Sequence, residues 1–103
     1  MTSQFPTGFS ADALQGKHIH FVGIGGCGMS GLARLIDRLG AKVRGTDSTE
    51  TPVTKTLIAD GISVSYTQDG SDLQPGTDLI VHSAAIPADH PEILLGEECA
   101  IPI

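Results

Sequence analysis

The feature that most constrains the fold is a glycine-rich stretch that directly follows a short apolar run. Residues 23–28 read GIGGCG and fit the pattern G-x-G-x-x-G. The residues before it, KHIHFV at 17–22, are typical of a buried strand, and residues 29–40 carry apolar side chains at helical spacing. A strand, a glycine turn and a helix in this order indicate the first half of a βαβ unit, which requires a parallel sheet.

The rest of the chain alternates in the same way. Proline at positions 52 and 91 suits the first residue of a helix, and Thr51 suits the cap before it. Strands are expected over 41–47, 62–66 and 78–84, helices over 51–61 and 89–100, and the start of a fifth strand at 101–103. This alternation predicts an α/β fold, a Rossmann-like, doubly wound parallel sheet of about five strands. We expect a flexible tail at 1–16 and a single domain at 17–103.

Composition excludes several classes of protein. All six Lys and Arg residues lie in the first 55 positions, and the rest of the chain is acidic, for a net charge of −6. An acidic chain disfavours nucleic acid and anionic membranes as partners. The sequence shows no signal-peptide pattern and no stretch long enough to span a membrane, so we expect a soluble cytoplasmic protein. Two cysteines without metal-ligand spacing predict neither a disulfide framework nor a metal site, and we expect Cys99 to pack inside a helix.

The glycine spacing gives the turn the properties of an anion site. Gly25 lets the backbone approach a phosphate, and the N–H groups of residues 26–30 are expected to point outward at the positive end of the helix dipole. Asp47 follows the last glycine by about 20 residues, at the end of the second strand, where an acid can accept hydrogen bonds from ribose hydroxyls. The pattern therefore predicts a site for a nucleotide diphosphate.

The residues alone leave the nucleotide open. An NAD(H)-binding module of a dehydrogenase or of a regulatory subunit fits the glycines and Asp47 almost as well, and a turn that serves only packing is a third reading. The sequence contains no G-x-x-x-x-G-K-[ST] loop for ATP. It also lacks a nucleophile paired with a base, so we expect no catalytic residue in this chain.

Three stretches resemble, in order, the N-terminal domain of the Mur ligase family: HIHFVGIGGCGMSGLA at 18–33, GTDSTETPVTKTL at 45–57 and VHSAAIPADHPEI at 81–93. They are most similar to the members that join L-alanine to UDP-N-acetylmuramate in peptidoglycan precursor synthesis. The resemblance implies a three-domain ligase whose central and C-terminal domains are missing from this chain and use ATP and Mg²⁺. It implies that this domain binds UDP-N-acetylmuramate without a cofactor of its own and does not catalyse.

The resemblance also assigns the site residues. Those expected around the diphosphate are Gly25, Gly26, Cys27, Gly28, Met29 and Ser30. Those expected at the uridine are Asp47 and Ser48. The crevice would be lined by His82, Ser83, Ala84, Ala85 and Ile86. Two positions depart from the common family pattern: Cys27 replaces a small residue such as Ala, and His90 replaces the Asn that commonly precedes Pro-Glu.

Overall fold

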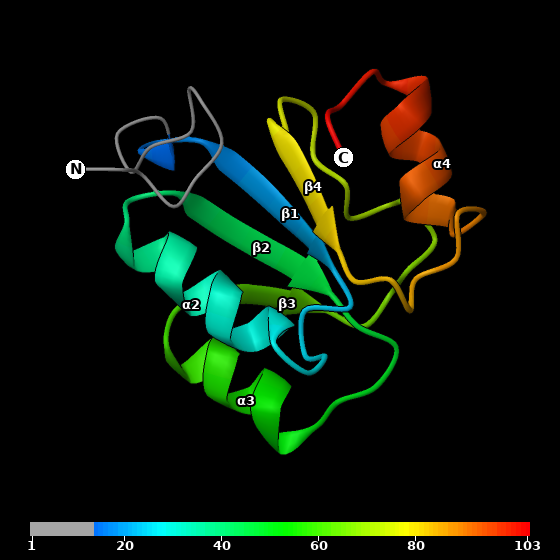
Figure 1. Cartoon of the computed structure of the whole chain (residues 1–103). Helices are drawn as coiled ribbons and strands as arrows, with labels where there is room; N and C mark the ends of the chain where they lie inside the picture. Colours follow the sequence, from blue (N-terminus) through cyan, green and yellow to red (C-terminus); the bar gives the residue numbers. More distant parts are fainter. Residues whose placement is uncertain (1–13) are drawn as a thin grey trace.

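The computed structural model describes residues 14–103 and has the predicted alternation of strands and helices (Figure 1). The strands are β1 (His18–Val22), β2 (Lys42–Thr46), β3 (Ser63–Ser65) and β4 (Leu79–His82). The helices are α2 (Met29–Arg38), α3 (Pro52–Ala59) and α4 (Pro91–Glu98). Each element lies inside the range that its sequence pattern predicts, so the prediction of a doubly wound parallel α/β fold is confirmed.

The four strands form one sheet in the order β3-β2-β1-β4, and every neighbouring pair is parallel. Val22 at the end of β1 pairs with Thr46 at the end of β2 and with His82 at the end of β4. The expected fifth strand is not formed within the described residues. Ile80 donates its N–H to the carbonyl of Pro102 at 2.8 Å, and this single bond does not make a ladder.

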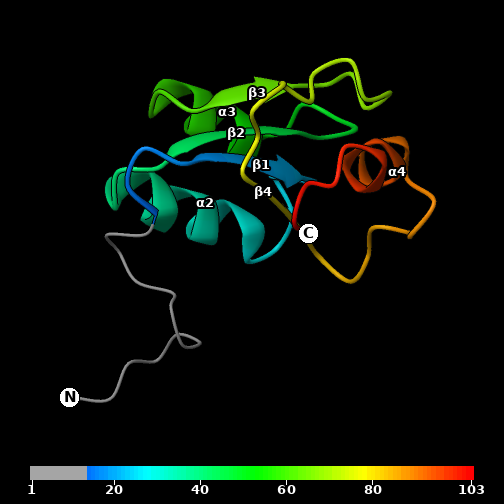
Figure 2. The ribbon, with the colours of Figure 1, turned by 90° about the horizontal axis from the view of Figure 1, so that it is seen from above.

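Helices cover both faces of the sheet. Phe21 and Val22 are consecutive strand residues, so their side chains point to opposite faces. Phe21 belongs to the larger apolar cluster, which includes α2 and α3 residues, whereas Val22 packs with Ile80 and with Ile93 of α4. Figures 1 and 2 show α4 on the β4 side of the molecule, apart from α2 and α3.

The three helices begin in different ways. Thr51 caps α3 as predicted: its hydroxyl accepts the Thr54 N–H at 3.2 Å, and Thr54 Oγ1 accepts the Thr51 N–H at 2.9 Å. At α4, His90 Nδ1 accepts the Glu92 N–H at 3.1 Å. By contrast, α2 follows Gly28 in the left-handed region (φ 79°), and no side chain among residues 14–103 caps it. The N-terminus of α2 is therefore open.

Two expectations from the sequence differ from the structure. Within the expected tail, residues 1–13 lie outside the described residues, but Leu14 is buried and Gly16 donates its N–H to the Gly40 carbonyl at 2.9 Å. An apolar side chain at position 14 fixes this segment to the core. Cys99 is exposed rather than buried, because it follows the last residue of α4.

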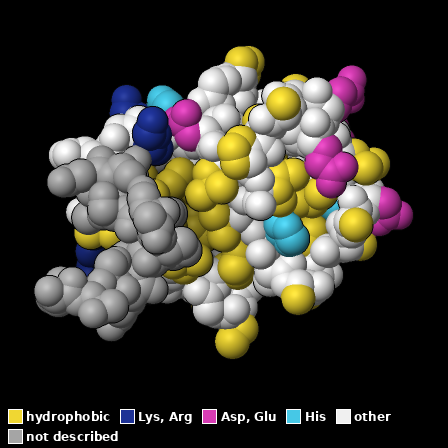
Figure 3. All heavy atoms as spheres, turned by 45° about the horizontal axis from the view of Figure 1, so that its top comes forward, with side chains coloured by type: hydrophobic (Ala, Val, Ile, Leu, Met, Phe, Trp, Pro, Cys, Tyr) yellow, Lys and Arg dark blue, Asp and Glu magenta, His cyan; other side chains and the backbone are white. Residues whose placement is uncertain are grey.

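The charge asymmetry of the sequence is visible on the surface. Figure 3 shows Lys and Arg side chains at one end of the face in view, next to acidic side-chain atoms, and further Asp and Glu side chains at the other end, with hydrophobic side chains between them. Among the described residues, no helix has the length and apolar character needed to cross a membrane.

Candidate functional site

The glycine turn is anchored to the neighbouring strand by the backbone. Gly23 has a φ of 76°, which lets the chain leave β1 sharply. The N–H groups of Gly23 and Ile24 both donate to the carbonyl of Thr46, at 2.9 and 3.0 Å. Ile24 is fully buried, and a Cβ on Gly45 of β2 would lie 2.8 Å from its side chain. The ends of β1 and β2 are thus held together beneath the turn.

Asp47 closes the turn with its carboxylate. Its Oδ2 accepts the Gly25 N–H at 2.8 Å, and its Oδ1 accepts the Ser48 N–H at 2.8 Å. A Cβ on Gly25 would lie 2.8 Å from Asp47 Oδ2 and 2.8 Å from Thr54 Cγ2. Gly25 is therefore needed for the close approach of Asp47. Each carboxylate oxygen keeps a further lone pair for a ligand hydroxyl.

The amides of the turn divide into two groups. Gly26 donates to the Gly23 carbonyl at 3.0 Å and Met29 donates to the Gly26 carbonyl at 3.1 Å, so these two N–H groups face into the turn rather than outward as expected. The amides of Cys27, Gly28 and Ser30 have no backbone or side-chain acceptor among the described residues. The first turn of α2 carries no acidic residue. The Gly31 amide, in the first turn of α2, likewise has no acceptor among the described residues. Free donors at the positive end of a helix favour an anion.

The loop after β4 forms the opposite wall. Ile86 packs against the turn, since a Cβ on Gly23 would lie 3.2 Å from Ile86 Cδ1. Two bonds shape this loop: the Ile86 N–H donates to the Ser83 carbonyl at 3.2 Å, and the Ala85 N–H donates to Ser83 Oγ at 3.3 Å. His82 Nδ1 lies 2.9 Å from the Ser83 carbonyl, and Ala84 is exposed.

The structure therefore brings the three groups of sequence-predicted residues to one edge of the sheet. The glycine turn, Asp47 with Ser48, and residues 83–86 follow the carboxyl ends of β1, β2 and β4, and β1 lies between the other two. In open α/β sheets, ligands bind outside the carboxyl ends of the strands, where the strand order reverses.

Sequence reasoning missed a buried polar cluster beneath this edge. Glu92 Oε1 lies 2.8 Å from His20 Nε2 and accepts the Thr46 hydroxyl at 2.7 Å, and all three residues are fully buried. Glu92 stands in the first turn of a helix, where an acid usually faces solvent and the helix dipole. No local signal in the sequence distinguishes it from such a surface acid.

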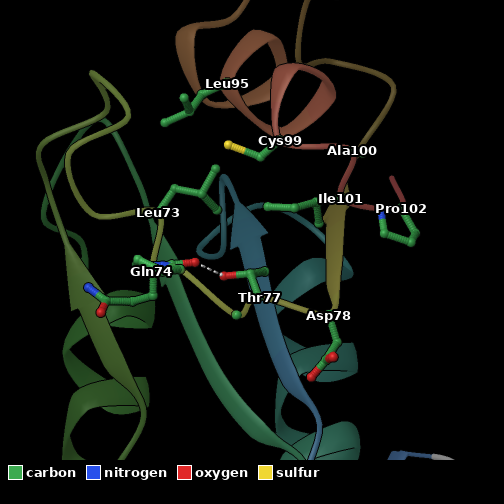
Figure 4. A pocket seen from close by; sticks show the side chains of 11 residues that line it. Leu73, Gln74, Thr77, Asp78, Leu95, Cys99, Ala100, Ile101 and Pro102 are labelled. Atoms are coloured by element: carbon green, nitrogen blue, oxygen red, sulfur yellow. Dashed lines mark hydrogen bonds between the residues drawn. The ribbon is translucent and has the colours of Figure 1, made fainter.

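A separate cavity of about 590 Å³ lies beside the amino end of β4. Figure 4 shows its walls: the loop with Leu73 and Thr77, Leu95 of α4, and the segment with Cys99 and Ile101. Its lining contains neither the glycine turn nor Asp47. This cavity is distinct from the candidate nucleotide site.

The fold and the glycine turn define a class: a doubly wound parallel α/β domain with an anion-favouring helix N-terminus at the carboxyl edge of its sheet. A family model described as "Mur ligase family, catalytic domain" matches residues 18–103. The chain belongs to the Mur ligase family.

Individual relatives agree with this assignment. The chain is 45% identical over 86 residues to a UDP-N-acetylmuramate–L-alanine ligase of Agathobacter rectalis and 44% identical over 87 residues to that of Chromobacterium violaceum. These matches cover 84% of this chain but only 19% and 18% of the relatives, so the chain spans about a fifth of their length.

Solved structures of the family have the same fold. The UDP-N-acetylmuramate-alanine ligase MurC of Thermotoga maritima matches with a TM-score of 0.79 and 35% identity, over 84% of this chain and 20% of that one. A UDP-N-acetylmuramate:L-alanyl-gamma-D-glutamyl-meso-diaminopimelate ligase of Neisseria meningitides matches with a TM-score of 0.76 and 30% identity, over 84% and 28%. Both similarities support the parallel α/β architecture described above.

Proposed function

We propose that the chain binds the uridine diphosphate part of UDP-N-acetylmuramate, and that the whole protein is the ATP-dependent ligase that joins L-alanine to this substrate. The observation that carries the proposal is the group of amides before and at the start of α2, beside Asp47, that have no acceptor among the described residues. The names of the relatives supply the substrate, because the two sequence relatives described above are named UDP-N-acetylmuramate–L-alanine ligases and the Thermotoga maritima structure is named a UDP-N-acetylmuramate-alanine ligase.

The diphosphate would bind at the N-terminus of α2. The Cys27, Gly28 and Ser30 amides would donate to its oxygens, and the helix dipole would stabilise its charge. Gly25, Gly26 and Met29 would shape this surface without donating their amides, since these already have acceptors inside the chain.

The uridine would bind beside the diphosphate. Asp47 and Ser48 would contact it, with the free lone pairs of Asp47 accepting from the ribose hydroxyls. His82 and Ser83 to Ile86 would form the other wall, because this loop already packs on Gly23.

Ligation itself requires ATP and Mg²⁺, which we assign to the central and C-terminal domains of the whole protein. Among residues 14–103, no group of three or more His, Cys, Asp and Glu side chains is arranged to hold a metal ion, and the sequence has no P-loop. These residues therefore do not fit the metal or the ATP. The proposal includes a cytoplasmic location, because the resemblance implies an enzyme of peptidoglycan precursor synthesis, and these precursors are made in the cytoplasm.

Calorimetric titration of the chain with UDP-N-acetylmuramate, UDP and NAD tests the proposal. We expect binding of the first two and none of NAD, since none of these relatives is named as an NAD protein. Cysteine alkylation tests where the ligand binds, because Cys27 and Cys99 are both exposed. Bound ligand should slow the alkylation of Cys27 and leave that of Cys99 unchanged. Binding of NAD without UDP compounds would instead support the dinucleotide module, and binding of neither would support a turn that only packs.

A further inference from the structure

Three fully buried polar side chains connect three elements beneath the carboxyl edge of the sheet. Glu92 comes from α4, His20 from β1 and Thr46 from β2. Glu92 Oε1 lies 2.8 Å from His20 Nε2 and accepts the Thr46 hydroxyl at 2.7 Å. Glu92 Oε2 and His20 Nδ1 have no hydrogen-bond partner among the described residues. Burial of a carboxylate with one free oxygen is costly, and an apolar residue would pack α4 at lower cost.

Thr46 is the junction between this cluster and the glycine turn. Its carbonyl accepts the N–H groups of Gly23 and Ile24, and the next residue, Asp47, accepts the Gly25 N–H. Its hydroxyl donates to Glu92 and accepts from Gln68 Nε2 at 3.2 Å. The conformation of Thr46 therefore sets the position of three consecutive amides in the turn.

Glu92 is connected to the opposite wall as well. It is the second residue of α4, directly after the loop that carries Ile86, and Ile86 packs against Gly23. The Glu92 N–H is also held, by His90 Nδ1 at 3.1 Å. The Glu92 side chain thus connects the glycine turn, through Thr46, with the start of α4, the helix that follows the loop at 83–86.

We propose that Glu92 is a positioning residue for the nucleotide site, which acts through Thr46 to fix the glycine turn relative to the loop at 83–86. This inference rests on the proposed function for its ligand, because the effect is measured as affinity for UDP-N-acetylmuramate. The carboxylate contributes an acceptor at one defined point between two walls, which apolar packing cannot do. Its effect on a ligand should therefore exceed what its effect on stability explains.

The experiment compares four single variants of the chain. Glu92→Met removes the acceptor at similar length, and Thr46→Val removes the hydroxyl but keeps the carbonyl. We expect each to weaken UDP-N-acetylmuramate binding roughly tenfold, the size of effect that loss of a buried hydrogen bond to a charged group produces. Glu92→Gln retains the Oε1 acceptor and should restore affinity to within about threefold. Ile93→Val, which loosens α4 without touching the cluster, should leave affinity unchanged.

A double variant and amide spectra complete the test. Because Glu92 and Thr46 act as one unit, Glu92→Met combined with Thr46→Val should bind no more weakly than either single variant. The ¹H–¹⁵N signals of Gly23, Ile24 and Gly25 should move in both single variants and stay in place in Ile93→Val. Should Glu92→Met fail to fold, Thr46→Val with its spectra carries the test alone.

Two results would overturn the inference. The first is that the losses of affinity in Glu92→Met and Thr46→Val add up in the double variant. The second is that the loss of affinity follows the loss of melting temperature in Ile93→Val as it does in Glu92→Met. Either result would make Glu92 a stabilising residue only. If the ¹H–¹⁵N signals of Gly23 to Gly25 stay in place in Thr46→Val, the inference is overturned as well. If the unmodified chain does not bind the UDP-sugar, the proposed function fails, and the amide signals of the ligand-free variants still decide the role of Glu92.

Discussion

Gly25 donates its backbone N–H to Asp47 Oδ2 at 2.8 Å, and this contact connects the two features that first point to a nucleotide site. The middle glycine of the motif and the acid after the second strand hold each other in place before any ligand arrives. Asp47 is thus part of the wall that shapes the turn as well as a candidate acceptor for ribose hydroxyls.

Replacing Gly25 with alanine should disrupt the packing of the turn against Asp47 and Thr54. The new Cβ would meet Asp47 Oδ2 and Thr54 Cγ2 at 2.8 Å, so we expect a loss of about 1–3 kcal/mol of stability from overpacking. Thermal denaturation measures this loss. Gly31→Ala is the matched control: its Cβ would meet nothing within 4 Å and lies in a helix, so it should gain about 0.5–1 kcal/mol. Equal effects in the two variants would contradict the packing described here.

Removing the carboxylate of Asp47 should loosen the turn without adding bulk. Asp47→Ala leaves the Gly25 and Ser48 amides without their acceptor, and since the site is only half-buried we expect a stability loss of about 1 kcal/mol. Affinity for UDP-N-acetylmuramate should fall by about tenfold or more, because the turn and a ribose contact are lost together. Asp47→Asn keeps one oxygen acceptor and should lie between the two. Unchanged affinity in Asp47→Ala would refute the assignment of Asp47 to the uridine.

Gly45 should be intolerant of any side chain. A Cβ there would lie 2.8 Å from both Ile24 Cβ and the Phe21 carbonyl oxygen, and the latter belongs to the backbone of β1 and cannot rotate away. We expect Gly45→Ala to cost about 1–3 kcal/mol and to reduce protection of the β1 and β2 amides from hydrogen exchange. Wild-type exchange rates in that variant would show that β1 and β2 do not pack as closely as described.

Asp69 gives a prediction for pH. Hydrogen bonds from the Ser71 hydroxyl and from its N–H, the latter at 2.9 Å, hold the pKa of Asp69 below its usual value. These bonds favour the carboxylate in the folded chain, so their contribution is present above the ordinary pKa of an aspartate and is lost as pH falls through the lowered one. Ser71→Ala should raise the pKa of Asp69 towards its ordinary value in an NMR titration, whereas Ser63→Ala should not. A pKa of Asp69 that stays low in Ser71→Ala would rule out this cause.

The sequence predicted those parts of the structure whose causes are local. The cap at Thr51, Pro52 at the start of α3 and the turn after Val22 follow from residues within one helical turn of each other. The grouping of Asp47 with the glycine turn also followed, because parallel strands end at the same edge.

The buried cluster could not be predicted because its partners meet only through the topology. His20 and Glu92 are 72 positions apart, and the helix that carries Glu92 reaches the sheet only after the chain has crossed to β4. The burial of Leu14 has the same origin, since Leu14 packs in the apolar cluster that contains Ala33 and Ile36 of α2. The prediction that the Gly26 and Met29 amides point outward was also wrong, because both donate to carbonyl groups within the turn.

A ¹H–¹⁵N titration of the chain with UDP-N-acetylmuramate tests the location of the diphosphate most directly. We expect the largest shifts at the Cys27, Gly28 and Ser30 amides, which have no acceptor among the described residues, and smaller shifts at Gly26 and Met29, which already donate within the turn. Asp47 and Ser48 should respond as the uridine contact, and the amides around Thr77, beside the separate cavity, should stay in place. Shifts centred on Thr77, with the amides at 27–30 unmoved, would contradict the placement of the nucleotide at the glycine turn.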